Sequence, residues 1–250
     1  GGLLFYDPAS GQQHSYLLTE DSRQAYNSNI IKAVYLSGDT IFCSTHKGEV
    51  YLFPISSRRF SLLKNFEYNN INSLCKDFQG GLWIPTHTSK GLVRLHNGQE
   101  TTTFPANGKE KRFSSVSVIT ETLPGQLLIG TENNGLYRYN LQTEELLHIA
   151  APDLGLPENT RIEVTAFHTD SHKNIWVATA NNGFLIFDQN LKHQPTPWNI
   201  SGTKEKITYI TESPRDYFWI ATTRQLYRYH RPSGKVQNFD AANGMPFQDF

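Results

Sequence analysis

The sequence holds little of what several large function classes require. Two of its 250 residues are cysteines, one is a methionine, and no apolar run approaches the roughly 18 residues of a membrane-spanning helix. Lys plus Arg and Asp plus Glu number 23 each, so the formal net charge is zero. That balance argues against a general binder of nucleic acid or anionic membrane, which needs a basic excess. We therefore expect no nucleic-acid partner and no direct membrane contact.

The two cysteines, Cys43 and Cys75, show neither metal-ligand nor redox spacing, and both fall in expected strands. We predict two buried free thiols. A disulfide stays open as an alternative, because it depends on a geometry that the sequence does not give.

Catalytic signatures are also missing. The chain has no Gly-x-Ser-x-Gly elbow, no P-loop and no His-Glu-x-x-His motif. His168 and His172 are four residues apart, which on a helix would place both on one face, but we expect them to flank a turn between two strands. We predict no metal site, no catalytic residue and no cofactor, so this segment is not expected to be an enzyme.

The residues that are abundant favour strands and turns: the chain has 12 Tyr, 15 Phe and 18 Gly. The stretch NIWVATANNGFLIFD, from Asn174 to Asp188, predicts a hairpin, because Asn and Gly tolerate positive φ at a tight turn. Its apolar run ends in a Thr, and the same pattern returns in four other places. The five threonines are Thr45, Thr86, Thr131, Thr179 and Thr222. They are spaced by 41, 45, 48 and 43 residues, close to the period of propeller blades.

The alignment extends backward from each Thr without gaps. Fifteen residues before it stand Ile30, Ile71, Val116, Val164 and Ile207. Twelve before it stand Ala33, Leu74, Ile119, Phe167 and Ile210. Three before it stand Phe42, Trp83, Leu128, Trp176 and Trp219, a position that we expect to pack between blades.

Each unit therefore predicts four consecutive strands, A to D, with the Thr ending strand B. Runs that are apolar on both faces indicate sheets stacked against one another. The predicted fold is an all-β propeller of four-stranded antiparallel blades, with five complete repeats and a partial N-terminal blade. The expected divisions are a partial blade at 2–18, blades at approximately 30–70, 71–113, 116–160, 164–204 and 207–239, and a connector at 240–250. Because the last segment is too short for strands A and B, we expect part of a larger propeller of about seven blades, or an imperfect closure.

The repeat resembles the two-component-regulator propeller repeat, whose usual form runs I-x-x-L-x-x-D-x-x-G-x-L-W-I-G-T-x-x-G-L-x-R-Y-D. The closest matches are INSLCKDFQGGLWIPTHTSKGLVRL, from Ile71 to Leu95, and LLIGTENNGLYRYN, from Leu127 to Asn140. The repeat Asp is kept as Asp77 and Asp170 and is replaced in the other units.

The resemblance implies a role. Members of that family are mostly extracytoplasmic sensor regions of hybrid two-component regulators in gut-dwelling and related bacteria, where propellers precede a small β-sandwich, one membrane span and a cytoplasmic histidine kinase. Their ligands are typically oligosaccharides released from polysaccharides. The resemblance thus implies a periplasmic location, contacts with neighbouring propeller or β-sandwich domains and an oligosaccharide ligand. A homodimer is a further possibility.

Binding residues are expected in the B–C loops, which in a propeller share one face with the D–A connectors. The candidates are His46, Lys47, His87, Lys90, Glu132, Asn133, Asn134, Asn181, Asn182 and Arg224. Amides, imidazoles and charged groups suit sugar hydroxyls, but Asn-Asn-Gly is also simply good turn chemistry. Two alternatives remain at this point. One is a propeller enzyme of the streptogramin-lyase type, which needs converging His and acid residues, and the other is a protein-interaction scaffold.

Overall fold

The computed structural model describes residues 2–18, 29–66, 70–85, 91–103, 115–196 and 205–240. The chain divides into two compact units, residues 1–116 and 117–250, and each is described by itself. Within the described residues there is no α-helix, and hence no helix long and apolar enough to cross a membrane.

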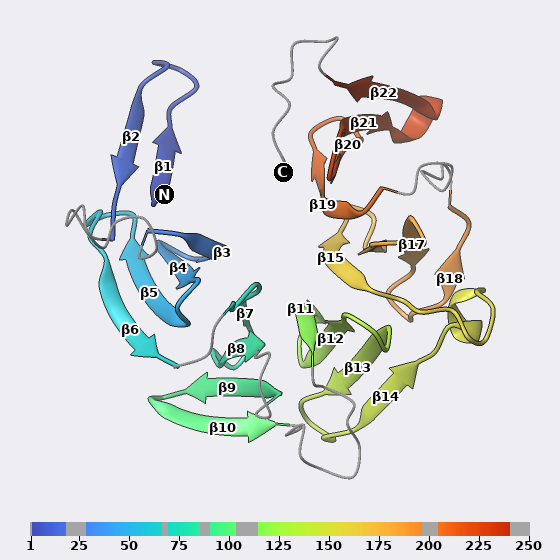
Figure 1. The fold of residues 1–250 in the computed structure, drawn as a ribbon, viewed down its shortest axis with the longest axis horizontal. Helices are drawn as coiled ribbons and strands as arrows, with labels where there is room; N and C mark the ends of the chain where they lie inside the picture. Colours follow the sequence, from blue (N-terminus) through green and yellow to red (C-terminus); the bar gives the residue numbers. More distant parts are fainter. Residues whose placement is uncertain are drawn as a thin grey trace. The chain divides into compact units, whose positions relative to one another are not determined.

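The first unit holds a two-stranded sheet and two four-stranded blades (Figure 1). The two-stranded sheet is β1 (Leu3–Tyr6) and β2 (Gln13–Tyr16). Blade 1 is β3 (Ile31–Ser37), β4 (Thr40–Thr45), β5 (Glu49–Pro54) and β6 (Ser61–Asn65). Blade 2 is β7 (Cys75–Lys76), β8 (Leu82–Pro85), β9 (Leu92–His96) and β10 (Gln99–Thr103).

The second unit holds three blades, and the division between the units falls at the start of β11. Blade 3 is β11 (Val116–Leu123), β12 (Gln126–Thr131), β13 (Leu136–Asn140) and β14 (Leu146–Ile149). Blade 4 is β15 (Val164–Thr169), β16 (Ile175–Thr179), β17 (Phe184–Phe187) and β18 (His193–Gln194), preceded by the 3₁₀ turn η1 (Pro152–Leu154). Blade 5 is β19 (Ile207–Ser213), β20 (Tyr217–Thr222), β21 (Leu226–His230) and β22 (Lys235–Phe239), with η2 (Arg231–Ser233) before its last strand.

Consecutive strands pair in order in every sheet, and the printed ladders are antiparallel. Neighbouring blades bury their faces against one another. The indole of Trp176 lies in one cluster with Phe218 and Ile220 of blade 5, with the Trp176 and Phe218 rings 4.4 Å apart. On the opposite face of blade 4, Val177 packs with Leu128 of blade 3. Four-stranded sheets stacked in this way are propeller blades, so the predicted fold class is confirmed. The expected packing between blades of the residue three before the Thr is confirmed for Leu128 and Trp176.

The gapless alignment is wrong at one place, strand A of blade 1. In blades 4 and 5 the residue twelve before the Thr pairs with the residue two before it, as in Ile210 with Ile220. In blade 1 the residue that pairs with Cys43 is Val34, not Ala33. The A–B turn there has two residues, and the first of them is Gly38 with φ of 59°, a conformation that fits a tight hairpin. This turn is one residue shorter than the corresponding turn of blade 5, so strand A is displaced by one position.

In blades 2 and 4 the aspartate of the repeat fixes the A–B turn. The carboxylate of Asp77 accepts a hydrogen bond from the backbone N–H of Gly81 at 2.8 Å and another from the indole Nε1 of Trp83 at 2.7 Å. Asp170 holds its own turn in the same way and accepts from the indole of Trp176 at 2.9 Å. One carboxylate thus joins the turn to the large residue that packs on strand B.

The two cysteines lie in β4 and β7, and both are buried free thiols as predicted. Burial raises the pKa of the Cys43 thiol to about 12. A thiol with such a pKa is almost entirely protonated near neutral pH, so it behaves as a small apolar side chain.

Candidate functional site

In the second unit, the threonine that marks each repeat hydrogen-bonds to the backbone of the B–C loop that follows it. The hydroxyl of Thr179 donates to the carbonyl of Gly183 at 2.7 Å and accepts from the backbone N–H of Asn182 at 2.9 Å. Thr131 makes the same two bonds in blade 3, and Thr222 makes them in blade 5, where Gln225 replaces the Gly. Each of these threonines is buried. The Thr131 and Thr179 hydroxyls therefore serve the loop's conformation, whereas the Thr222 hydroxyl also bonds Glu205 Oε2, in the connector before blade 5, at 2.7 Å.

In the second unit, the B–C loops are connected to the segments that lead into strand A. The backbone N–H of Gly135 in blade 3 donates to the carbonyl of Ile162, just before blade 4, at 3.1 Å. Lys206 Nζ, just before blade 5, lies 2.5 Å from Glu163 Oε1, just before blade 4. We call this surface the B–C rim and define it as residues 131–135, 160–163, 179–183, 205–206 and 222–225. It joins loops and connectors at one end of three successive blades, as the sequence predicts.

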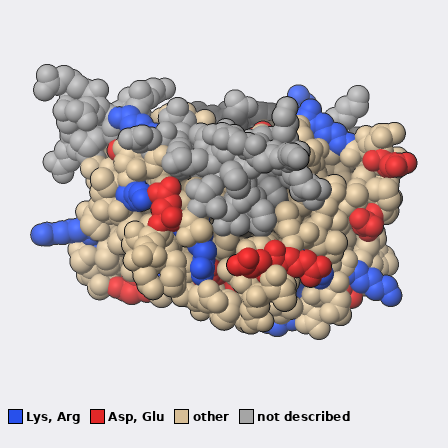
Figure 2. All heavy atoms as spheres, turned by 90° about the horizontal axis from the view of Figure 1, so that it is seen from below, with Lys and Arg blue, Asp and Glu red and all other residues tan. Residues whose placement is uncertain are grey.

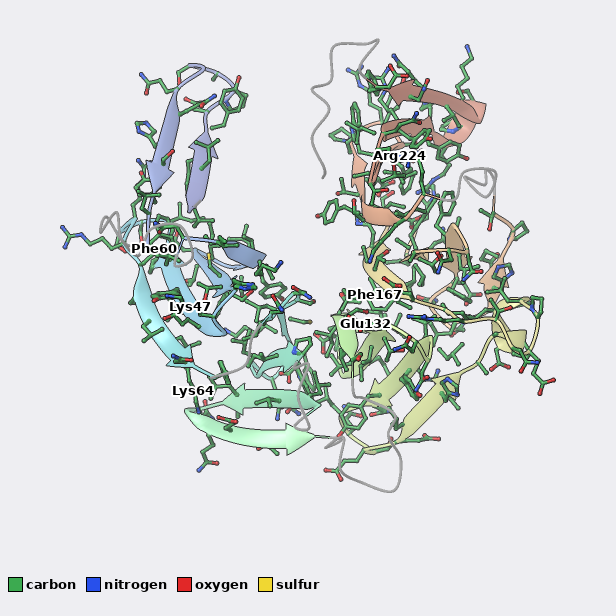
Figure 3. All side chains as sticks on the ribbon, in the orientation of Figure 1. Lys47, Phe60, Lys64, Glu132, Phe167 and Arg224 are labelled. Atoms are coloured by element: carbon green, nitrogen blue, oxygen red, sulfur yellow. The ribbon has the colours of Figure 1, made fainter. Side chains whose placement is uncertain are left out.

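Six of the predicted ligand-binding residues lie on the B–C rim, and Figure 3 labels two of them. They are Glu132, Asn133, Asn134, Asn181, Asn182 and Arg224. His46 and Lys47 are exposed on the corresponding loop of blade 1, in the other unit. His87 and Lys90 lie outside the described residues.

The side chains of the rim residues differ in whether they are hydrogen-bonded within the protein. The side-chain amide of Asn182 donates to the carbonyl of Arg161 at 3.1 Å, which ties the loop to the connector. In contrast, Asn133, Asn181 and Arg224 are exposed, and within the described residues their side chains have no hydrogen-bond partner. These three groups are therefore available to a ligand or to another domain.

Sequence reasoning did not identify the individual residues His148, Glu163 and Lys206 that contact this surface. His148, at the end of blade 3, bonds through Nε2 to the carbonyl of Asn134 at 2.9 Å, and its ring stacks on Tyr137 at 4.5 Å. Glu163 and Lys206 each stand sixteen residues before a repeat Thr. That shared position is the sequence signal that could have identified them, since neighbouring blades carry opposite charges there.

A second polar cluster lies at the opposite end of blades 4 and 5, where the A–B turns are. Arg231 donates to Asp170 Oδ2 at 2.8 Å and to Glu212 Oε1 at 3.1 Å, and its guanidinium lies over the ring of Phe218. Ser171 donates its hydroxyl to Glu212 at 2.9 Å. We call these groups the A–B cluster. It connects the A–B turn of blade 4 to two strands of blade 5.

The two histidines noted in the sequence belong to this cluster but bind different partners. His168 Nε2 accepts from the backbone N–H of Glu212 at 3.1 Å, while His172 contacts the guanidinium of Arg231. Burial lowers the pKa of His168 below its ordinary value, although Glu212 and Asp170 act in the opposite direction. Within the described residues no three His, Cys, Asp or Glu side chains gather as a metal site would require. The cluster links blade 4 to blade 5.

A cleft of about 290 Å³ lies on this same end of blades 3 and 4, where it is lined among others by Arg138, Glu145 and Asn190. None of the described residues that the sequence singles out for binding contributes to it. Over the face drawn in Figure 2, Lys and Arg are interspersed with Asp and Glu, and the described residues there form no continuous basic stripe.

Comparisons with known proteins agree with the repeat. Histidine kinase P4 of Formosa agariphila is 23% identical over 207 residues, which are 79% of this chain and 15% of the kinase. The extracellular domain of a Bacteroides protein (B. thetaiotaomicron) described as a hybrid two-component system superposes with a TM-score of 0.75 at 17% identity. That match covers 99% of this chain and 32% of the domain. The chain resembles the extracellular domains of hybrid two-component systems.

A second B. thetaiotaomicron domain of this kind gives a TM-score of 0.55 at 16% identity, covering 99% of this chain and 46% of that domain. Virginiamycin B lyase from Staphylococcus aureus gives 0.64 at 14% identity, covering 84% of this chain and 69% of the lyase. No protein-family model matches the sequence. The resemblance predicted from the repeat is confirmed, and the propeller corresponds to a part of each longer two-component protein.

Proposed function

We propose that the chain is an extracytoplasmic, non-enzymatic sensor segment of a hybrid two-component regulator, and that the B–C rim is its contact surface. The likeness to extracellular domains of such systems supports the class of protein. The proposal that the rim is a binding site rests on the exposure of three of its side chains. Asn133, Asn181 and Arg224 are exposed on loops that their threonines hold in one conformation.

A carbohydrate is the ligand that this chemistry suits best. Amide and guanidinium groups donate hydrogen bonds to hydroxyl oxygens, and an amide oxygen also accepts from them. A rim that is already ordered loses little conformational entropy on binding. The proposed ligand class is therefore an oligosaccharide from polysaccharide breakdown. Signalling requires that this ligand bind two arrangements of the full regulator with different affinity, because equal affinity shifts no equilibrium.

The test is titration calorimetry of the complete extracytoplasmic region with a panel of oligosaccharides. For a sugar that binds, Asn181→Ala and Arg224→Ala each weaken affinity about tenfold, the loss of one good hydrogen bond. The matched control is Lys192→Ala, an exposed residue at the opposite end of blade 4, which leaves affinity unchanged. Binding that is indifferent to both rim variants would place the ligand elsewhere and refute the rim as the site.

The second candidate function, a propeller lyase, rests on the likeness to virginiamycin B lyase. It needs a histidine and an acid that converge on a substrate. Among the described rim residues and their bonded neighbours, the histidine is His148, whose Nε2 is engaged by Asn134. Turnover of a streptogramin by the purified propeller, abolished by a histidine substitution, would favour this second function over the sensor.

A further inference from the structure

The sheet β1–β2 has the position of strands C and D in a blade that precedes blade 1. The backbone N–H of Gly2 donates to the carbonyl of Asn29 at 2.7 Å, just before strand A of blade 1. Gly135 makes the same bond to Ile162 between blades 3 and 4. The rings of Phe5 and Tyr16 pack on Phe53 of β5, with centroids 5.6 and 5.1 Å apart. The contact between β1–β2 and blade 1 is thus the ordinary contact between successive blades.

On the same face of blade 1, apolar side chains of strand β3 are left exposed to solvent. Val34 and Leu36 of β3 are 55% and 59% exposed. The residue at the register position of Val34 is Ile210 in blade 5 and Leu74 in blade 2, and these are 1% and 5% exposed. Both pack in clusters that they share with the preceding blade of their unit. Blade 1 therefore presents apolar strand A residues where the repeat elsewhere places a covering blade.

Strand β1 also has a free edge. Within the described residues it pairs with β2 alone, whereas the C strand of each complete blade pairs on both sides (Figure 1). Asp7 N donates to Gln12 O next to the ladder, so by alternation the backbone groups of Phe5 point to β2 and those of Leu4 and Tyr6 point away. The side chains of Leu4 and Tyr6 are 60% and 59% exposed. Natural proteins rarely leave such an apolar edge uncovered.

From this free edge and bare face we infer that β1–β2 is the outer half of a blade whose inner half is an A–B hairpin of the same repeat, supplied by sequence of the same polypeptide outside residues 1–250. The hairpin pairs antiparallel with β1 and covers Val34 and Leu36. Its register follows from blades 2, 3 and 4, where the residue before the Thr pairs with the residue after the strand C Gly, as Ala178 does with Phe184. The partner of that residue here is Leu3.

Blade 5 indicates that the repeat continues. In blades 3 and 4 the residue three before the Thr, Leu128 or Trp176, is buried against the next blade. The corresponding Trp219 is not buried and contacts Phe239 and Arg228 of its own sheet. This face therefore fits strands A and B of a following repeat. The inference does not depend on the sensor function, since any propeller of this repeat would need the hairpin.

Hydrogen exchange resolved to single amides tests the inference in the natural, longer polypeptide and in the 250-residue chain. We expect the amides of Leu4 and Tyr6 to exchange about a hundredfold or more slowly in the longer polypeptide, because they are then hydrogen-bonded. The amide of Phe5, which faces β2, is the internal control and is protected in both. Equal, fast exchange of Leu4 and Tyr6 in both polypeptides would overturn the inference.

A substitution gives a second, independent readout. Val34→Lys lowers the melting temperature of the longer polypeptide and leaves that of the 250-residue chain unchanged, because a covering hairpin would bury the charge. The matched control is Leu62→Lys, on outer strand β6, where an inner hairpin does not reach. Protection of Leu4 that rises with protein concentration, together with a dimer in sedimentation, would assign the edge to a second copy and contradict the proposed occupant.

Discussion

Asp170 of blade 4 and Arg231 of blade 5 form an ion pair with a 2.8 Å N–O distance, and the carboxylate is almost fully buried. The same carboxylate oxygen accepts from the indole of Trp176. Burial alone would raise the pKa of Asp170, but its hydrogen bonds and the charge of Arg231 outweigh that effect and hold the pKa below its ordinary value. One side chain thus couples a turn, a strand and the next blade.

Removal of this carboxylate should destabilise the second unit. We expect Asp170→Ala to cost about 3 kcal/mol, since Arg231 is left in a partly buried place without its main partner. The measurement is the urea midpoint at neutral pH. The matched control is Glu145→Ala, an exposed acid in the C–D turn of blade 3, which should change the midpoint little. Similar midpoints for the two variants would contradict the role assigned to Asp170.

Mild acid should weaken the contact between blades 4 and 5 through His168. Its imidazole faces Glu212, Asp170 and Arg231, and burial holds its folded-state pKa below the unfolded value of about 6.5. The unfolded chain therefore binds more protons in this range, so the stability due to the neutral ring is present above about pH 6.5 and is lost as the pH falls. We expect His168→Gln to flatten the decline of the melting temperature between pH 7 and 5. An unchanged pH profile would show that His168 does not control it.

At lower pH, protonation of two buried aspartates should cause the loss of stability. Asp77 and Asp170 both have folded-state pKa values below the ordinary one, although burial opposes this, because of hydrogen bonds from Trp, backbone and Arg partners. Their contribution is present above about pH 4 and is lost as the pH falls through the lowered values. In Asp77→Asn, melting curves recorded from pH 5 to 2 should fall less steeply than in the unsubstituted protein. Parallel curves would be evidence against this assignment.

The hydrogen bonds between Thr179 and its loop predict that two conservative substitutions differ in their effect on stability. Thr179→Val removes both bonds to the B–C loop and should cost about 1–2 kcal/mol of stability, whereas Thr179→Ser keeps the hydroxyl and should cost less. Denaturant unfolding measures the stability, and amide exchange of Asn182 reports the loop itself. If Val and Ser variants behave alike, the hydroxyl is not what holds the turn.

The two cysteines should not react with thiol reagents in the folded protein. With a pKa of about 12 and a buried sulfur, the Cys43 thiol has almost no thiolate at pH 7.5. We expect no modification by a maleimide in native buffer and modification of both cysteines after denaturation, as read by mass spectrometry. Rapid labelling of the native protein at Cys43 would contradict its placement in the core.

The repeat and its strands could be predicted because the Thr, the Gly and the apolar positions recur at fixed spacing. The one-residue displacement of Val34 could not, because it depends on how tightly Gly38 turns. The different uses of Asn181 and Asn182 were also beyond the pattern, since both fit the same turn and the connector's carbonyl decides which is engaged. The pairing of Glu163 with Lys206 requires knowing which blades adjoin.

Thr131, Thr179 and Thr222 each hydrogen-bond to the backbone of their own B–C loop, so the residues that shape these loops differ from the residues that are exposed on them. The outermost side chains, such as Asn133, Asn181 and Arg224, can be exchanged without disturbing the bonds that shape the turn. In such a propeller the exposed side chains of the loops can vary while the loop backbone keeps one conformation. Its recognition can then diversify by substitution at a few exposed positions while every blade keeps its packing, which is how antibody loops diversify on a fixed sandwich.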